Sequence, residues 1–304
     1  MDISIIIVNY NTAQITKNCL DSIFKFTQNI DFEVIVVDNA SSDNSREILS
    51  NYPGIRFIQS NINLGFGKAN NLGYQYTSGK YILFLNSDTL LKNNAIKLFY
   101  DCFNKQSENV ACIGSWLLAP DGSINNSFGT IPTIKQACIS TLNLYFHVFT
   151  KKNKIKAQND IDTNQILKVG YIMGADLCIR RTVIDKLGLF DPDFFMYYEE
   201  SEMQYRYHKA GYSMIIVPGP QIVHLECAST KENGKKYTYK NRIMFFTSYF
   251  LYMKKRYSYL YYLLFRFIFL FNFPIFFRPY YSKTEKIKLL RFICSPLKKS
   301  PIYE

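Results

Sequence analysis

The chain has 304 residues, of which 48% are hydrophobic and 20% are charged. This balance is typical of a folded globular protein and excludes a disordered or fibrous chain. The seven cysteines are scattered and form no CxxC pair, which argues against a disulfide framework or a four-thiolate zinc site and favours a reducing compartment. No secretory signal is visible before the first apolar run, so we expect a cytosolic protein.

The net charge of +12 is concentrated in the last quarter of the chain. Residues 1–228 contain 20 Lys and Arg against 21 Asp and Glu, whereas residues 229–304 contain 16 against 3. The last segment also holds 22 of the 49 Phe and Tyr residues. We therefore expect a globular domain at 1–228 and a basic, aromatic, helical extension at 229–304 that associates with a membrane.

Short apolar runs alternate with amphipathic stretches in the first half of the chain. Runs rich in Ile and Val predict buried strands, and apolar spacings of three to four residues predict helices between them. The predicted strands are Ile3–Val8, Val34–Val37, Ile55–Ile58 and Tyr81–Leu85, and the predicted helices are Thr12–Phe26, Asp43–Leu49 and Asn93–Phe103. Successive βα units indicate an α/β fold with a doubly wound, mostly parallel sheet.

The pattern weakens in the middle of the chain and then returns. Residues 120–168 are polar, with a basic stretch, and predict surface loops that could act as a lid. After them, Val169–Arg181 predicts a strand, 188–206 an acidic helix start, and Ser213–Val217 a last strand that leads to His224.

Polar residues follow three of the predicted strands. They are Asn9, Tyr10 and Asn11, then Asp38 and Asn39, then Asn86, Ser87 and Asp88. Ligands of doubly wound sheets bind at the carboxyl ends of the strands, so we expect these side chains at the binding edge. Asp88 can hold Mg²⁺ or Mn²⁺, which prefer oxygen ligands. The alternative is that Asp88 caps the helix predicted at Asn93–Phe103.

Three acidic residues, Glu199, Glu200 and Glu202, follow a run of aromatic residues at 194–198. Carboxyl groups beside aromatic rings are partly desolvated, which raises their pKa toward the range that a general base needs. The alternative is that their charge complements the positive end of a helix that starts here, and both can hold at once.

Histidines and glycines give weaker signals. His224 could complete a metal site with Asp88, although a hydrogen-bonded structural histidine is the ordinary outcome. His147 and His208 are interpreted as structural. The glycines of Asn61–Gly73 would let backbone amides approach a phosphate, but their spacing misses the GxGxxG pattern, which argues against a dehydrogenase.

The segment Tyr257–Phe277 has 21 residues and one charge, which is close to the ~20 apolar residues that cross a bilayer. Arg266 near its centre, Asn272, Pro274 and several tyrosines prefer the headgroup region. We favour helices that lie on the cytoplasmic leaflet. A spanning helix and a buried core or dimer helix are the alternatives.

Seven motifs occur in order over residues 1–228. They are SIIIVNYNT, VVDNASSDNS, NLGFGKANN, YILFLNSDT, the MGAD and IRR pieces near residue 175, LGLFDPDFFMYYEE and the late His224. Together they resemble the family 2 glycosyltransferases, specifically the rhamnosyltransferase-like branch. The resemblance implies a GT-A fold, a nucleotide-sugar donor, a divalent metal ion and inversion at the anomeric carbon.

The resemblance also implies roles for individual residues. The donor nucleotide would be bound by Asn9, Tyr10, Asp38, Gly65, Lys68, Asn86, Ser87 and Asp88, with Asp38 accepting from the ring N–H of the base. Asp88 and His224 would hold Mg²⁺ or Mn²⁺, because Asn86 replaces the first acidic residue of the family's DxD motif. Glu200 falls on the catalytic aspartate of the family's ED motif, with Glu199 before it. The acceptor would lie at Gly174, Ala175 and Glu202.

These features predict an inverting glycosyltransferase for cell-surface glycan synthesis. It would move a sugar such as rhamnose from a dTDP- or UDP-linked donor to a polyprenyl-linked or polysaccharide acceptor, on the inner face of the cell membrane. One carboxylate removes the acceptor's hydroxyl proton while a cation neutralises the departing nucleoside diphosphate. The alternative is a non-catalytic sugar-nucleotide or membrane-binding protein on the same fold. Nucleic acid is not expected as a partner, because the aromatic residues of the tail lie in apolar runs.

Overall fold

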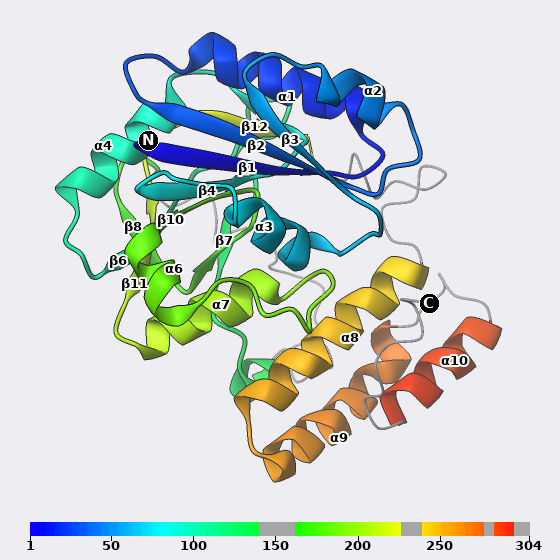
Figure 1. Cartoon of the computed structure of the whole chain (residues 1–304). Coiled ribbons are helices and arrows are strands. Elements are labelled where there is room, and N and C mark those ends of the chain that lie inside the picture. The colour runs from blue at the N-terminus through cyan, green and yellow to red at the C-terminus, as the bar shows by residue number, and fades with distance from the viewer. Residues whose placement is uncertain (140–161, 226–238, 277–282, 295–304) are drawn as a thin grey trace. The chain divides into compact units, whose positions relative to one another are not determined.

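The computed structural model describes residues 1–139, 162–225, 239–276 and 283–294 (Figure 1). The chain divides into two compact units. The first comprises Met1–Ile131 and Thr163–Lys236, and the second comprises Pro132–Asp162 and Tyr237–Glu304. The sequence analysis placed one boundary, after residue 228, whereas the structure groups the stretch from Pro132 with the C-terminal helices.

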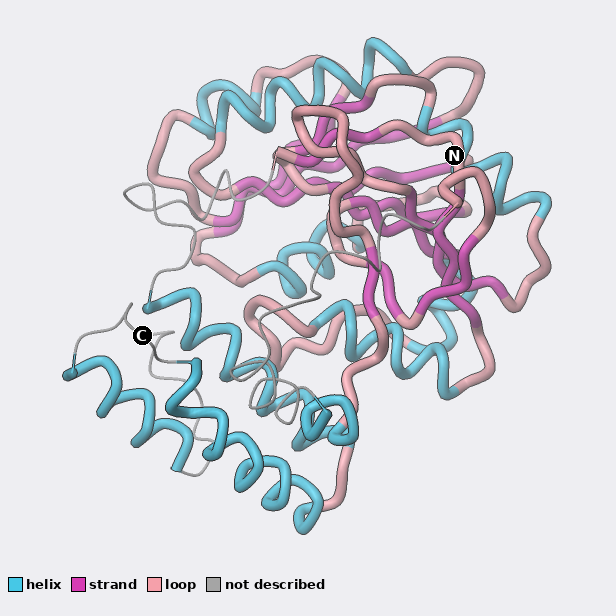
Figure 2. The backbone as a smooth tube through the Cα atoms, turned by 180° about the vertical axis from the view of Figure 1, so that it is seen from behind, coloured by secondary structure: helices cyan, strands magenta, loops and turns pink. Residues whose placement is uncertain are grey.

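The first unit is built around an eight-stranded sheet with the order β3-β2-β1-β4-β10-β6-β11-β8. Its strands are drawn in magenta in Figure 2. Its strands are β1 (Ile3–Asn9), β2 (Phe32–Asn39), β3 (Ile55–Ser60), β4 (Tyr81–Leu85), β6 (Val110–Ser115), β8 (Leu167–Val169), β10 (Asp176–Arg180) and β11 (Ser213–Val217). β1 is parallel to β2 and β4, β2 to β3, and β6 to β11. β10 runs antiparallel between β4 and β6, and β8 is antiparallel to β11. The predicted α/β fold with a mostly parallel sheet is confirmed.

Helices pack on both faces of this sheet. They are α1 (Ala13–Phe26), α2 (Ser45–Ser50), α3 (Phe66–Tyr74), α4 (Ala95–Lys105), α6 (Arg181–Leu187) and α7 (Glu199–Lys209). Val34 and Val36 of β2 join the main core, which also contains side chains of α1, α2 and α4. Ile35 and Val37 of the same strand pack with Ala69 of α3 on the other face. Because successive strand residues point to opposite faces, the unbroken apolar run of β2 serves both cores.

Two short ladders complete the strands of the first unit that the structure describes. β5 (Thr89–Leu91) pairs with β12 (Ile222–His224), and β7 (Phe128–Gly129) pairs with β9 (Tyr171–Ile172). In the first ladder His224 lies opposite Thr89, which directly follows the YILFLNSD stretch. This pairing brings the late histidine to the carboxyl end of β4.

Asp88 is not a helix cap, so that alternative is wrong. The chain continues from Asp88 into strand β5, and α4 begins only at Ala95, after Asn94. Helix capping requires the capping residue to stand directly before the first helical turn.

The single strand predicted at Val169–Arg181 is also wrong, because the segment contains the end of β8, then β9 and β10. Gly170 lies against the backbone that follows β7, where a Cβ would be 2.6 Å from the nitrogen of Ile131. This close approach directs β9 to pair with β7 instead of with the main sheet. Residues 140–161 of the predicted lid at 120–168, among them His147, lie outside the described residues, as does Cys227.

The second unit contains helices from both of its chain segments. They are α8 (Tyr239–Arg256), α9 (Tyr259–Phe276) and α10 (Lys283–Cys294), together with helical residues at 134–139. The ring of Phe250 in α8 packs edge-on against Phe265 and Phe269 of α9, with centroids 5.6 and 5.0 Å apart. Arg256 Nη1 donates to the carbonyl oxygen of Pro132 at 2.5 Å. None of the helices in the described ranges combines the length and apolarity that a membrane span requires.

Candidate active site

The carboxyl ends of β1 and β2 are joined by a buried polar cluster. Asn9 Nδ2 donates to Asp38 Oδ1 at 2.7 Å, and Asn9 Oδ1 accepts from the hydroxyls of Thr12 and Thr16 at 3.0 and 2.7 Å. Asp38 Oδ2 accepts from the backbone N–H of Ser41 at 3.2 Å. Asn9 and Asp38 are fully buried. The cluster therefore fixes the Asp38 carboxylate at the sheet edge where the sequence predicted a nucleoside contact.

The turn after β1 presents an aromatic ring beside this cluster. Tyr10 keeps 39% of its surface exposed. Asn11, the next residue, has a positive φ of 54°, and its side-chain oxygen accepts from the backbone N–H of Ser42 at 2.7 Å. This hydrogen bond holds the turn, and a tyrosine ring at a sheet edge can stack on a planar base.

The end of β4 and the end of β12 bring Asn86, Asp88 and His224 together. His224 Nε2 lies 3.3 Å from Asp88 Oδ1 and 3.4 Å from Asn86 Nδ2. Asp88 is 7% exposed. Ser87 Oγ lies 3.4 Å from the hydroxyl of Thr12, which connects this group with the Asn9 cluster. The sequence-predicted pair of Asp88 and His224 is therefore adjacent, although 136 positions separate the two residues in the sequence.

A divalent cation fits the donor atoms of Asp88 and His224. Two neighbouring ligands at about 2.1 Å from one ion stand roughly 3 Å apart, which is close to the 3.3 Å that separates Oδ1 and Nε2. A carboxylate suits Mg²⁺ and Mn²⁺, and imidazole is a common metal ligand. Within the described ranges no cluster of three or more His, Cys, Asp or Glu residues could hold a metal ion.

A third carboxyl group, Asp176 of β10, lies next to these residues in the sheet and was not predicted. Asp176 Oδ2 accepts from the backbone N–H and the hydroxyl of Ser115 at 2.7 and 2.5 Å. Asp176 Oδ1 is buried, and no hydrogen bond joins it to another group in the described part of the chain. Burial raises the pKa of Asp176 to about 7, against the lowering effect of the Ser115 hydrogen bonds. Asp176 therefore gains or loses its proton near neutral pH.

The predicted acceptor residues Gly174 and Ala175 lie beside Asn86. The backbone N–H of Asn86 donates to the carbonyl oxygen of Ala175 at 3.0 Å. A Cβ at Gly174 would lie 3.0 Å from the ring of Phe66. Both residues are thus part of the same sheet edge, where their backbone positions the end of β4.

Glu199 and Glu200 are the first residues of α7, as both interpretations of the acidic run required. The two residues before them, Tyr197 and Tyr198, have positive φ values of 71° and 67°. Non-glycine residues in the left-handed region cost roughly 1 to 3 kcal/mol each. The strained turn directs the chain into α7 so that Glu199 is buried and Glu200 is partly exposed.

The two glutamates have raised pKa values for the same main reason, which is burial. The pKa of Glu200 rises to about 7, and the pKa of Glu199 rises well above its usual range, with the charge of Glu200 as a further cause. The charge of Glu200 also adds to burial in raising the pKa of Tyr171 in β9 to about 12. Both carboxyl groups therefore hold their protons to a higher pH than an ordinary glutamate, and the upward shift is larger for Glu199.

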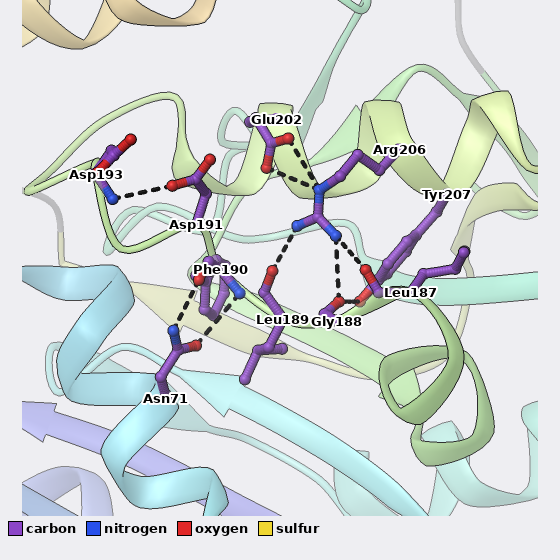
Figure 3. A network of polar contacts seen from close by, with 10 residues as sticks. All are labelled: Asn71, Leu187, Gly188, Leu189, Phe190, Asp191, Asp193, Glu202, Arg206 and Tyr207. Atoms are coloured by element: carbon purple, nitrogen blue, oxygen red, sulfur yellow. Dashed lines mark hydrogen bonds and ion pairs between the residues drawn. The ribbon is translucent and has the colours of Figure 1, made fainter. Parts of the chain in front are cut away.

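Glu202 faces a different partner from the one predicted. Its two carboxylate oxygens accept from Arg206 Nε at 2.9 and 3.0 Å, one helical turn further along α7 (Figure 3). The same guanidinium donates to the carbonyl oxygens of Leu187 and Leu189. Tyr207 donates from its hydroxyl to the carbonyl of the residue between them at 2.8 Å. Glu202 thus orients the arginine that holds the loop at residues 187–189, and its acceptor contact stays a prediction.

Gly65 and Lys68 were predicted to contact the donor, and the structure gives them different surroundings. A Cβ at Gly65 would lie 2.1 Å from the carbonyl oxygen of Phe195, and Gly65 has a positive φ of 77°. The following N–H, of Phe66, donates to the same oxygen at 2.8 Å. Gly65 therefore allows the aromatic loop to pack on α3, whereas Lys68 is exposed on that helix.

Sequence reasoning missed Asp176, Arg206 and Gln204. Gln204 donates to the carbonyl oxygen of Ile172 at 2.7 Å and accepts from its N–H at 2.8 Å, which ties α7 to β9. The available signal was a polar residue at an apolar position: Asp176 interrupts the strand pattern of β10, and Gln204 is fully buried in α7. A buried polar side chain requires a hydrogen-bond partner, and the partner shows which elements the side chain joins.

Comparison with known proteins identifies this arrangement. Over 96% of the chain, the structure is similar to 70% of the S. aureus TarS 1-349 crystal structure, with a TM-score of 0.52 and 13% sequence identity. It is also similar to GalNAc-T7 with UDP, GalNAc and Mn²⁺, with a TM-score of 0.55 and 15% identity over 80% of this chain and 47% of that one. At these identities the likeness shows the fold alone, which is the GT-A fold.

The sequence comparison then gives the family. Residues 4–117 match the model of glycosyl transferase family 2. A low-salt glycan biosynthesis hexosyltransferase of Haloferax volcanii is 30% identical over 67% of this chain and 61% of its own length. An N-acetylglucosaminyl-diphospho-decaprenol L-rhamnosyltransferase of Mycobacterium tuberculosis is 24% identical over 65% of this chain and 67% of its own length. The chain belongs to the family 2 glycosyltransferases.

Proposed function

We propose that the chain is an inverting, metal-dependent glycosyltransferase. The observation that carries the proposal is the 3.3 Å separation of Asp88 and His224, joined through Ser87 and Thr12 to the buried Asn9–Asp38 cluster. A nucleoside contact and a diphosphate-binding pair on one sheet edge fit a nucleoside-diphosphate sugar. Residues 1–228 would form the catalytic domain, and residues 229–304 a basic extension.

The residues of this site have distinct roles in the proposed reaction. Asp38 holds the nucleoside, and Asp88 and His224 would hold Mg²⁺ or Mn²⁺. When bound, the ion would supply positive charge for the departing diphosphate. Glu200 takes the proton from the acceptor hydroxyl as the acceptor oxygen bonds to the anomeric carbon. The bond between this carbon and the diphosphate oxygen breaks on the opposite side. A pKa of about 7 matches a base that works at neutral pH.

The donor and acceptor are proposed from the relatives. The mycobacterial relative is named as a rhamnosyltransferase that acts on a decaprenol-linked sugar. We propose a dTDP- or UDP-linked sugar donor, with rhamnose as the first candidate, and a polyprenyl-linked or glycan acceptor for cell-surface polysaccharide. A lipid-linked acceptor would place the enzyme on the inner face of the cell membrane as a peripheral protein.

The proposal is tested by calorimetric titration of dTDP- and UDP-sugars with and without Mn²⁺. The intact chain should bind one donor class more tightly with the ion, and Asp88→Ala should remove this metal dependence without unfolding the chain. His224→Ala should weaken metal affinity by roughly 10-fold to 100-fold. Donor binding that is unaffected by Mn²⁺ in the unaltered chain would contradict the metal site. Metal-dependent binding without sugar transfer to any acceptor would favour the non-catalytic binding protein.

A further inference from the structure

One side of α9, the helix drawn in orange in Figure 1, carries exposed apolar residues. Leu260, Leu263, Leu264 and Phe267 keep 75%, 41%, 47% and 59% of their surface exposed, and we call these four residues the α9 face. Residues separated by three, four and seven positions lie on the same side of a helix. Exposed apolar side chains that form a continuous stripe mark a binding surface, whereas isolated ones need no explanation.

The opposite side of α9 already forms the core of the second unit. Tyr262, Phe265 and Phe269 are buried, and the rings of Phe265 and Phe269 pack on Phe250 of α8. Phe246 of α8 adds an edge-on contact with Phe269 at 5.1 Å. The α9 face is therefore not needed for packing α9 against α8.

The helices around the α9 face are strongly basic. α8, α9 and α10 together contain ten Lys and Arg residues and one acidic residue, Glu285. Lys254 and Lys255 are exposed at the end of α8, a few residues before Leu260. Arg256, in contrast, is tied to Tyr252 and to the carbonyl of Pro132. Exposed leucines flanked by lysines match the boundary between acyl chains and anionic headgroups.

We propose that the α9 face docks onto an anionic lipid bilayer, with its apolar side chains at the acyl boundary and Lys254 and Lys255 against lipid phosphates. This inference rests on the proposed function only for the use of the docking surface, which would bring the enzyme to a polyprenyl-linked acceptor in the bilayer. A second copy of this chain fits less well, because two such faces would bring like charges together. The phosphates of a nucleic acid would contact the lysines, but nothing in it would bury the exposed leucines.

The test is flotation of the full-length chain with vesicles of phosphatidylcholine alone or with 30% phosphatidylglycerol. The chain should bind the anionic vesicles, and Leu260→Glu with Leu264→Glu should weaken this binding roughly 100-fold, about tenfold for each leucine removed from the bilayer. Lys254→Glu with Lys255→Glu should reduce binding to the anionic vesicles and make the remaining binding less sensitive to salt.

The matched control is Leu98→Glu, the same substitution at a leucine of α4 in the first unit that is 36% exposed. This variant should bind vesicles like the unaltered chain. Thermal melts of all variants check that the fold is intact, which is expected because the altered side chains are exposed. Equal vesicle binding by the α9 variant and the control would overturn the proposal. So would a dimer, or a complex with duplex DNA, that only the α9 variant fails to form.

A transfer or donor-hydrolysis assay in the absence of vesicles separates this inference from the proposed function. The Leu260→Glu, Leu264→Glu variant should keep full activity on a water-soluble acceptor. A chain that binds vesicles through the α9 face but turns over no donor would refute the enzyme and leave the docking surface standing. A chain that transfers sugar but does not bind vesicles would support the enzyme and refute the docking surface.

Discussion

Neighbouring glutamates at the start of α7 differ in exposure and in pKa, and this difference supports the proposed role of Glu200. The pKa of Glu200 is about 7 and its side chain is partly exposed, whereas Glu199 is buried and its pKa is raised further. A general base must ionise near the working pH and be reachable by the acceptor, which favours Glu200 over Glu199.

Glu200→Gln should leave donor affinity nearly unchanged and lower turnover by ~10² to 10⁴. The amide keeps the size of the side chain but cannot take a proton from the acceptor, and general-base catalysis contributes on this scale. Single-turnover kinetics with separate donor titration measures the two effects.

Glu199→Gln is the matched control one residue away. Because the Glu199 carboxyl holds its proton to a higher pH than Glu200 does, an amide of the same shape should change turnover only a few-fold. A dead Glu199→Gln with a normal Glu200→Gln would show that the assignment of the base is reversed. If both variants turn over normally, another carboxyl group must be the base.

The pH dependence of turnover should follow Glu200. Its pKa of about 7 means that the working, deprotonated form increases as the pH rises through 7, and kcat/KM should fall up to tenfold for each pH unit below that value. A profile measured from pH 5 to 9 should show this acidic limb. The limb should disappear from the residual activity of Glu200→Gln, and a flat profile in the unaltered chain would count against Glu200.

At the scale of elements, the contact between Asp176 of β10 and Ser115 of β6 should make the free energy of unfolding depend on pH. Asp176 holds a proton in the folded protein up to about pH 7, whereas in the unfolded chain it loses that proton near its usual pKa of 3.8. The folded state therefore binds more protons between these values, and stability falls as the pH rises from about 4 to 7, by up to ~4 kcal/mol.

Asp176→Asn removes this titration and should flatten that part of the curve. Urea unfolding at pH 5 and pH 8 measures the change, and the variant should lose less stability between the two than the unaltered chain does. An unchanged difference would mean that Asp176 ionises freely in the folded protein. Ser115→Ala, which removes one hydrogen bond to the same carboxylate, is a useful comparison.

The sequence was informative wherever structure depends on neighbours along the chain. Tyr81–Leu85 was predicted with its observed bounds, and the helix predicted at Thr12–Phe26 begins one residue later, because apolar spacing and local turns decide these elements. The antiparallel insertion of β10 between β4 and β6 was not predictable in the same way. Strand neighbours depend on contacts between residues far apart in the sequence, about which periodicity says nothing.

The same limit applies to the candidate site. The polar residues at the carboxyl ends of β1, β2 and β4 were found from their place in the pattern. The link from Asp88 to His224 was proposed from their residue types and was also implied by the resemblance to a family. The contacts of Arg206 with the loop at residues 187–189 were missed because these partners are carbonyl oxygens, and every residue type has one. Its i,i+4 pairing with Glu202 was visible in the sequence as a helical spacing. The left-handed turn at Tyr197 was also invisible, since tyrosine has no preference for that conformation.

For the whole molecule, we expect the first unit to fold without the C-terminal helices. Its main core is formed by residues up to Ile222, all within the first unit. A chain truncated after residue 240 should melt cooperatively and bind the donor nucleotide. Circular dichroism and calorimetry measure this. Loss of the cooperative transition would show that the aromatic helices are part of an obligatory core.

The position of β10 in the sheet also constrains how the protein can be made. During synthesis β1 to β4 can pair as soon as they emerge, but the far edge of β4 must wait for β10, about 90 residues later. At roughly 5 to 20 residues per second this takes about 5 to 18 seconds. An unpaired apolar strand edge is a template for aggregation during that interval. Ribosome-bound chains ending between residues 90 and 175 would therefore be the ones that need chaperones, and slower translation through this region would lower the yield of folded enzyme.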